Sequence, residues 1–158
     1  APRRIPSPMI DDRTLRRRAE EVRQYLCGDS SGQYLKALRG FPAGCCKVAS
    51  LLLLQWLNDT EDVEDAFGVG NARRPNPRTG ASEQTHFWLE VGDTIVDITA
   101  DQFDDHNEPI HVSSDRVWHD TFSGGKRFAK NELIPLTVKL LQEYSLMTRH
   151  LGPATRSR

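Results

Sequence analysis

The segment that decides the fold consists of two runs of alternating side chains joined by a glycine, and it reads Thr85-His86-Phe87-Trp88-Leu89-Glu90-Val91-Gly92-Asp93-Thr94-Ile95-Val96-Asp97-Ile98-Thr99. A period of two predicts β-strands over residues 85–91 and 94–99. Gly92-Asp93 is a pair suited to a two-residue hairpin turn, which would pair Val91 with Thr94. The turn thereby fixes the register of the two strands.

This register predicts which side chains share a face of the hairpin. One face would carry His86, Trp88, Glu90, Ile95, Asp97 and Thr99, and the other Thr85, Phe87, Leu89, Val96 and Ile98. His86 and Asp97 become diagonal neighbours, about 7 Å apart at the backbone, which one hydrogen bond can close. A solvated polar face is the ordinary alternative for such a hairpin. Trp88 and Ile95 on the same face argue that it is covered.

Residues 45–58 predict a core helix, because Val48, Leu51, Leu52, Leu54 and Trp56 make it apolar on all sides. We expect an α+β fold in which this central helix packs on a small antiparallel β-sheet. Cys45 and Cys46 lie at the start of the helix, where the positive end of the helix dipole favours a thiolate.

The other segments are less distinctive. A half-buried helix should begin at Asp11-Asp12 and bury Leu15, Ala19, Val22 and Leu26, with Cys27 as a buried apolar residue. The acidic stretch 59–65 is interpreted as a solvated connection, residues 66–70 as a short strand and 71–84 as a loop. The segment 100–130 should be irregular apart from a short strand near 110–112. A last helix is expected over about 131–146, starting near Pro135.

Length and composition bound the function classes. A chain of 158 residues with 37% hydrophobic residues and a net charge of -1 predicts a single domain over 1–158, with flexible ends at 1–10 and 152–158. The near-neutral charge argues against a nucleic-acid partner, and the longest apolar run, Leu51–Leu54, is too short for a membrane span. Three cysteines, two of them adjacent, suggest reduced thiols in the cytoplasm. A role as a translocated effector stays open.

Three histidines in the irregular segment raise the question of a metal. His106, His111 and His119 lie near Asp104 and Asp105, but their spacing follows no familiar ligand pattern. We therefore expect solvated histidines, no metal and no cofactor.

The order of motifs resembles the papain-like and transglutaminase-like superfamily of cysteine enzymes. The motifs, which fall within residues 40–105, are Gly44-Cys45-Cys46-Lys47-Val48-Ala49-Ser50, His86-Phe87-Trp88-Leu89-Glu90-Val91 and Val96-Asp97-Ile98-Thr99. The resemblance implies catalytic Cys46, His86 and Asp97 and acyl transfer through a thioester. The family pattern of Gly-x-Cys with a small residue four positions later selects Cys46 as the nucleophile. Cys45 would be a small filler or a second reactive thiol.

The resulting functional prediction is a thiol hydrolase or acyltransferase acting on a protein or peptide amide, as a peptidase, amidase, deamidase or transglutaminase-type enzyme. We assign Trp88, Gly44 and Cys45 to substrate binding. Asp101 and Gln102 are interpreted as structural more than as lining the site. The Cys46 backbone N–H is expected to stabilise the oxyanion, with the second donor undetermined. The alternative is a non-catalytic protein-interaction domain on the same fold. The sequence leaves the exact substrate and the oligomeric state open.

Overall fold

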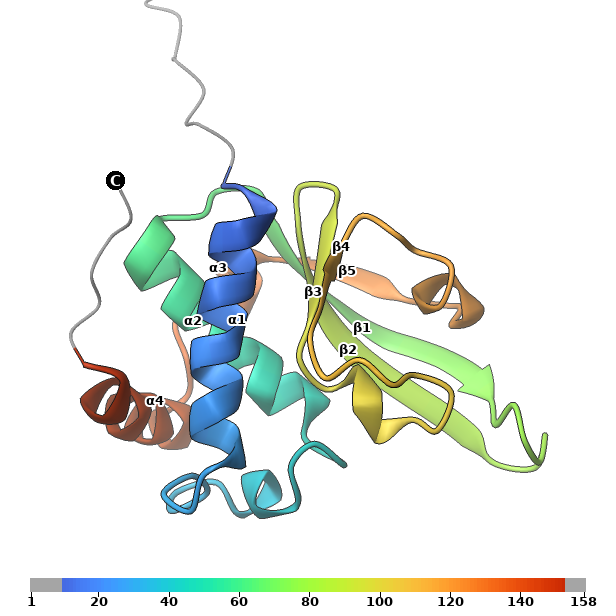
Figure 1. Cartoon of the computed structure of the whole chain (residues 1–158), viewed down its shortest axis with the longest axis horizontal. Helices are drawn as coiled ribbons and strands as arrows, with labels where there is room; N and C mark the ends of the chain where they lie inside the picture. Colours follow the sequence, from blue (N-terminus) through green and yellow to red (C-terminus); the bar gives the residue numbers. More distant parts are fainter. Residues whose placement is uncertain (1–9, 153–158) are drawn as a thin grey trace, which may run out of the picture.

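The computed structural model describes residues 10–152, which form an α+β fold with four α-helices and a five-stranded antiparallel sheet (Figure 1). The helices are α1 (Asp12–Cys27), α2 (Cys46–Glu61), α3 (Lys130–Leu133) and α4 (Val138–Leu151). The strands are β1 (Ala66–Pro75), β2 (Glu83–Val91), β3 (Thr94–Asp97), β4 (His111–Ser113) and β5 (Lys126–Ala129), in the order β4-β3-β2-β1-β5. Short 3₁₀ helices lie between these elements, namely η1 (Lys36–Gly40), η2 (Ala100–Gln102) and η3 (His119–Thr121). The flexible ends expected at 1–10 and 152–158 lie outside the described residues, except for 10 and 152.

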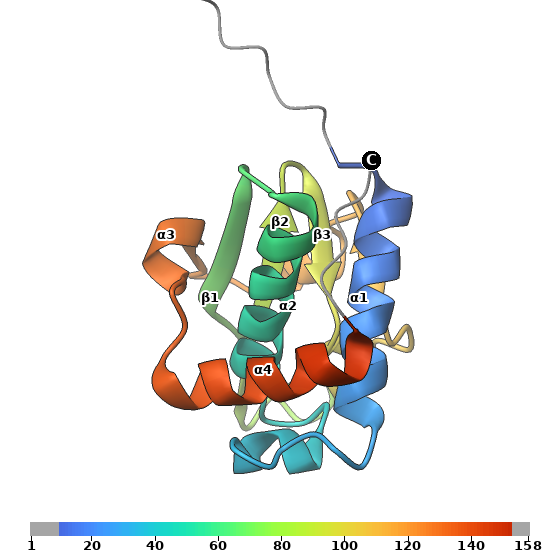
Figure 2. The same cartoon turned by 90° about the vertical axis from the view of Figure 1, so that its left-hand side faces the viewer.

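The sheet is covered differently on its two faces. Helices α1, α2 and α4 lie on one face, with α4 running across the other two (Figure 2). The main core lies there and includes Leu52, Leu53, Leu54 and Trp56 of α2 with Phe87, Leu89 and Val91 of β2. The connection from 98 to 125, which we call the covering segment, supplies Phe103 and Phe122 to a smaller cluster that also holds Trp88 and Ile95.

The hairpin has the predicted register. Val91 pairs with Thr94, Glu90 with Ile95 and Leu89 with Val96. Gly92 adopts φ +57, a left-handed conformation that costs glycine little, so the two-residue turn forms without strain. The two predicted faces are confirmed, because Trp88 and Ile95 pack in the smaller cluster while Leu89 and Val96 pack in the main core.

The strand predicted at 66–70 is confirmed but is longer than expected, and the loop predicted over 71–84 is confined to 76–82. Strand β1 continues to Pro75 and pairs with β2 along its length. Val69 faces Trp88 but Ala72 faces His86, so three steps along β1 match two along β2. This β-bulge contains Asn71 at φ +60. Strand β5, which pairs with the other edge of β1, was also missed.

Several element boundaries also differ from the sequence predictions. Helix α2 takes in part of the acidic stretch and ends at Glu61, which accepts a hydrogen bond from Arg18 at 2.8 Å. Pro135 separates two helices, because α3 ends at Leu133 and α4 begins at Val138. Cys27 is exposed, not buried, because it is the last residue of α1 and follows the buried Leu26. Asp11 caps α1 as predicted, accepting from the Thr14 N–H at 2.8 Å.

None of the helices formed by residues 10–152 combines the length and the apolar character needed to cross a bilayer.

Candidate active site

The two adjacent thiols at the start of α2 have different environments. Cys45 is 2% exposed, and its thiol donates to the Pro42 carbonyl at 3.6 Å. Burial, with a smaller contribution from the neighbouring Cys46, raises the pKa of Cys45 to about 11. Cys46, the first residue of the helix, is partly exposed. Cys45 therefore stays protonated at neutral pH, and Cys46 is the accessible thiol.

His86 and Asp97 meet as the register predicts. Nε2 of His86 lies 2.6 Å from Oδ2 of Asp97, and both side chains are fully buried. The other carboxylate oxygen, Oδ1, accepts the backbone N–H of Thr99 at 3.0 Å. Burial raises the pKa of Asp97, but the charge of His86 and the hydrogen bonds from His119 and His86 outweigh it and hold the pKa well below its usual range. Asp97 is thus a carboxylate at neutral pH.

The thiol of Cys46 approaches the same imidazole. Burial lowers the pKa of His86, but the charge and hydrogen bond of Asp97, together with the Cys46 thiol, outweigh it and raise the pKa to about 9. Nε2 is taken by Asp97, so Nδ1 is the nitrogen left for the thiol. No hydrogen bond of normal geometry reaches Nδ1 within the described part of the chain. Such loose alignment is common in catalytic pairs before substrate binds.

His119 is a third residue of the buried network and was missed by the sequence prediction. We call His86, Asp97 and His119 the trio. Nε2 of His119 lies 2.8 Å from the same Oδ2 of Asp97, and the His119 side chain is fully buried. The expectation of a solvated histidine is therefore wrong. His119 belongs to η3 in the covering segment, 22 residues beyond Asp97. Its neighbour Trp118 is the one local sign of burial, since no periodic pattern marks this segment.

Aromatic rings from the covering segment enclose His86. Phe103, Trp118 and Phe122 lie with their ring centroids 5.0, 5.8 and 5.7 Å from the His86 ring. Arg74 of β1 packs over the same three rings at 5.4, 5.1 and 4.4 Å. Its guanidinium also forms an ion pair with Asp105 at 2.7 Å, so Arg74 fastens the covering segment to the sheet.

His86, Asp97 and His119 offer three ligand atoms that lie within 4.8 Å of one another, which raises the question of a metal. Tetrahedral zinc, with bonds of about 2.0–2.1 Å, keeps its ligand atoms about 3.3 Å apart. Here the carboxylate oxygen lies 2.6 and 2.8 Å from the two nitrogens, as in hydrogen bonds. Metal-bound histidines also donate their second N–H, whereas Nδ1 of His86 and of His119 find no partner among the described residues. The trio fits a hydrogen-bonded network better than a metal centre.

The residues predicted to bind substrate lie in three different settings. Gly44 is exposed at φ +72 beside Cys46, whereas the side chain of Cys45 is turned into the core. Trp88 is 3% exposed, and its ring packs at a tilt against His86 and edge-to-face against His119, with centroids 5.5 and 4.9 Å away. A substrate at Cys46 would therefore meet Gly44, while Trp88 packs against the two histidines.

Gln102 and Asp101 have separate roles. Oε1 of Gln102 accepts the Gly44 N–H at 3.4 Å, and its Nε2 donates to the Thr99 carbonyl at 3.1 Å. Gln102 therefore lies beside the turn that carries Cys46. Asp101 forms an ion pair with Arg23 at 2.7 Å, which ties η2 to α1 as a structural residue.

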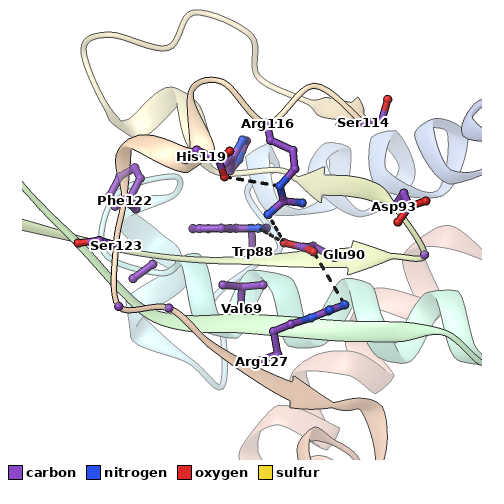
Figure 3. A pocket seen from close by; sticks show the side chains of 15 residues that line it. Val69, Trp88, Glu90, Asp93, Ser114, Arg116, His119, Phe122, Ser123 and Arg127 are labelled. Atoms are coloured by element: carbon purple, nitrogen blue, oxygen red, sulfur yellow. Dashed lines mark hydrogen bonds and ion pairs between the residues drawn. The ribbon is translucent and has the colours of Figure 1, made fainter.

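A pocket of about 570 Å³ opens on the face of the sheet that carries the covering segment (Figure 3). Among the described residues, its lining includes Trp88, His119 and Glu90 but neither Cys46 nor His86. Glu90 is buried there and pairs with Arg116 at 3.1 Å and with Arg127 at 4.0 Å. The pocket thus reaches the trio from the side of His119, away from the thiol.

Comparison of the chain with protein-family models, with curated proteins and with solved structures gives no significant match. The geometry of the site is therefore the basis on which its function is inferred.

Proposed function

We propose that the chain is a cysteine-dependent acyl-transfer enzyme that acts on amide bonds, with the architecture of papain-like and transglutaminase-like enzymes. One observation carries this proposal: a thiol at the N-terminus of a buried helix contacts a histidine whose other ring nitrogen is held by a buried carboxylate. A nucleophile, its base and a group that orients the base are the three parts that thiol catalysis needs.

The first half of the reaction forms the thioester. Nδ1 of His86 takes the proton of Cys46, and the thiolate attacks the carbonyl carbon of the amide. The new C–S bond gives a tetrahedral oxyanion, which the backbone N–H at the open end of α2 can stabilise. The C–N bond then breaks, and His86 returns the proton to the departing amine.

The second half releases the acyl group. Water or an acceptor amine gives a proton to His86 and attacks the thioester carbon, and the C–S bond breaks with the proton returning to Cys46. Asp97 keeps the ring in the Nε2–H tautomer and stabilises the imidazolium formed in each half. Water as acceptor gives hydrolysis or deamidation, and an amine gives transfer.

Support for Cys46 as the nucleophile comes from the contrast with Cys45. The two thiols share the same helix end, but Cys45 is buried and its pKa is raised to about 11. Only Cys46 combines exposure with a histidine neighbour.

Selective alkylation tests this function without a known substrate. The native protein is treated with limiting iodoacetamide at pH 7, and modification of each cysteine is followed by peptide mass spectrometry. Cys27, which is exposed, serves as the internal reference for an ordinary thiol. We expect Cys46 to react at least tenfold faster than Cys27, because a thiolate reacts and a thiol does not.

The His86→Phe variant is the matched control, and it should bring Cys46 to the rate of Cys27. Equal rates at Cys46 and Cys27 in the wild-type protein would favour a non-catalytic interaction domain on the same fold.

A further inference from the structure

The carboxylate of Asp97 is shared in a way that the proposed reaction does not require. A single oxygen, Oδ2, faces Nε2 of His86 at 2.6 Å and Nε2 of His119 at 2.8 Å. Both histidines must carry their proton on Nε2 to donate to it, because a carboxylate only accepts. Nδ1 of His119 has no partner among the described residues, so the bond to Asp97 is the polar contact that holds this ring.

We propose that His119 is a positioning residue of the thiol site, which shares the Asp97 oxygen with His86 and thereby limits how tightly the carboxylate holds the His86 proton. This inference rests on the proposed function and deepens it. An oxygen that accepts two N–H groups has less charge to offer each of them, so the second donor weakens the first bond. A base that must give its proton to a leaving amine benefits from this weakening.

The remaining groups around the pair do not supply the same effect. His86 meets Cys46 from α2, Asp97 from β3 and His119 from η3, and its other close ring neighbours are Trp88, Phe103, Trp118 and Phe122. His119 has His111 of β4 at 4.6 Å and His106 at 6.3 Å between ring centroids. Burial lowers the pKa of His111, so this neighbour stays neutral near pH 7. The charged groups nearest along the chain, Arg116 and Asp120, bind each other at 3.5 Å.

The first test uses the unmodified protein. The ¹⁵N chemical shifts of the imidazole nitrogens report which nitrogen carries the proton in the neutral ring. We expect the Nε2–H form for both His86 and His119. An Nδ1–H form at His119 would overturn the proposal, because that ring could not donate to Asp97.

The second test measures the pKa of His86 in three variants at position 119. His119→Phe keeps a ring but removes the donor, His119→Gln places an amide N–H near the position of Nε2, and His119→Asn places it near Nδ1. We expect the pKa of His86 to rise by about half to one unit in the Phe and Asn variants, since one neutral hydrogen bond is lost, and to stay at the wild-type value in the Gln variant. If the Phe variant does not fold, the difference between Gln and Asn decides.

The control is His106→Phe, which changes a ring of the same cluster that has no bond to Asp97. It should leave the pKa of His86 unchanged. Equal values in the wild-type, Phe, Asn and Gln proteins would show that His119 only fills space. Because no substrate is involved, this outcome is separate from that of alkylation: selective labelling of Cys46 without the pKa change would leave a thiol enzyme in which His119 is structural.

Discussion

At the scale of single residues, folding places the adjacent thiols of Cys45 and Cys46 in different environments. Cys45 closes the turn with its thiol on the Pro42 carbonyl, while Cys46 starts the helix beside His86. We expect Cys46→Ala to reduce turnover of an amide or thioester substrate by about 10³-fold or more, with the fold intact. Cys45→Ala should retain activity.

These two variants, assayed against a panel of amides and thioesters, also locate the nucleophile. Loss of activity in Cys45→Ala with full activity in Cys46→Ala would move the nucleophile by one residue. Activity in both variants and in the double variant would end the thiol mechanism.

On the proposed mechanism Asp97 acts through His86, so its replacement should damage catalysis less completely than loss of Cys46. Asp97→Asn keeps the size of the side chain but removes the charge that holds Nε2 and stabilises the imidazolium. We expect kcat/KM to fall by about 10²–10⁴-fold while Cys46 stays accessible to iodoacetamide. Wild-type kcat/KM in this variant would remove Asp97 from the mechanism.

The parts of the site that the sequence predicts are those fixed by local geometry. His86 and Asp97 lie on one hairpin, and a two-residue turn sets their relation. Cys46 is found through its place at the start of an apolar helix. His119 reaches Asp97 through the path of an irregular segment, and nothing in the spacing of residues 98–119 encodes that path.

At the scale of elements, the bulge in β1 decides which residues cover the site. Three side chains of β1 lie on the face of the sheet under the covering segment. Val69 and Ala72 join the smaller cluster, and Arg74 packs on its rings. In a regular strand, residues 72 and 74 would face away from residue 69. The extra residue therefore turns Arg74 toward the covering segment.

The backbone of the bulge makes a testable demand on residue 71. Asn71 is exposed at φ +60, a conformation that asparagine and glycine tolerate and β-branched residues resist. We expect Asn71→Val to lower the free energy of unfolding by about 1–2 kcal/mol in urea titrations, while Asn71→Gly changes it by about 0.5 kcal/mol or less. Equal stability of the Val and Gly variants would show that the bulge is not under conformational strain.

The same strand shows where sequence periodicity fails. Glycines at 68 and 70 and polar residues at 71, 73 and 74 hide the strand from a search for apolar alternation. Gly68 and Gly70 are needed because a Cβ there would lie 2.7 and 3.0 Å from Phe87. The strand is thus defined by its partner β2, which is a long-range cause that local propensity does not contain.

At the scale of the whole molecule, the buried ion pair makes stability depend on pH. The pKa of His86 is raised from 6.5 to about 9, so its contribution is complete below pH 6.5 and is lost as pH rises through 9. The pKa of Asp97 is lowered from 3.8, so its contribution is present above pH 3.8 and is lost at lower pH. We expect the free energy of unfolding to fall by a few kcal/mol at most between pH 6.5 and 9 (about 1.4 kcal/mol per pKa unit), and Tm to decline with it.

The Cys46→Ser protein is the suitable background for this measurement, because it removes the thiol that can exchange a proton with His86. In that background Asp97→Asn should abolish most of the decline, since the partner charge is gone. An unchanged slope in the Asn variant would assign the decline to other groups.

The site draws on each layer of the molecule: Cys46 comes from the helices, His86 and Asp97 from the sheet, and His119 from the covering segment. A chain whose covering segment has not yet docked leaves the imidazole in water, where the pull of Asp97 on it is weak. On the proposed mechanism, thiol reactivity is then acquired in the last step of folding. The thiol of the nascent chain is then not activated while the chain is still on the ribosome. The rate at which Cys46 becomes reactive after dilution from denaturant measures how fast the native state is completed.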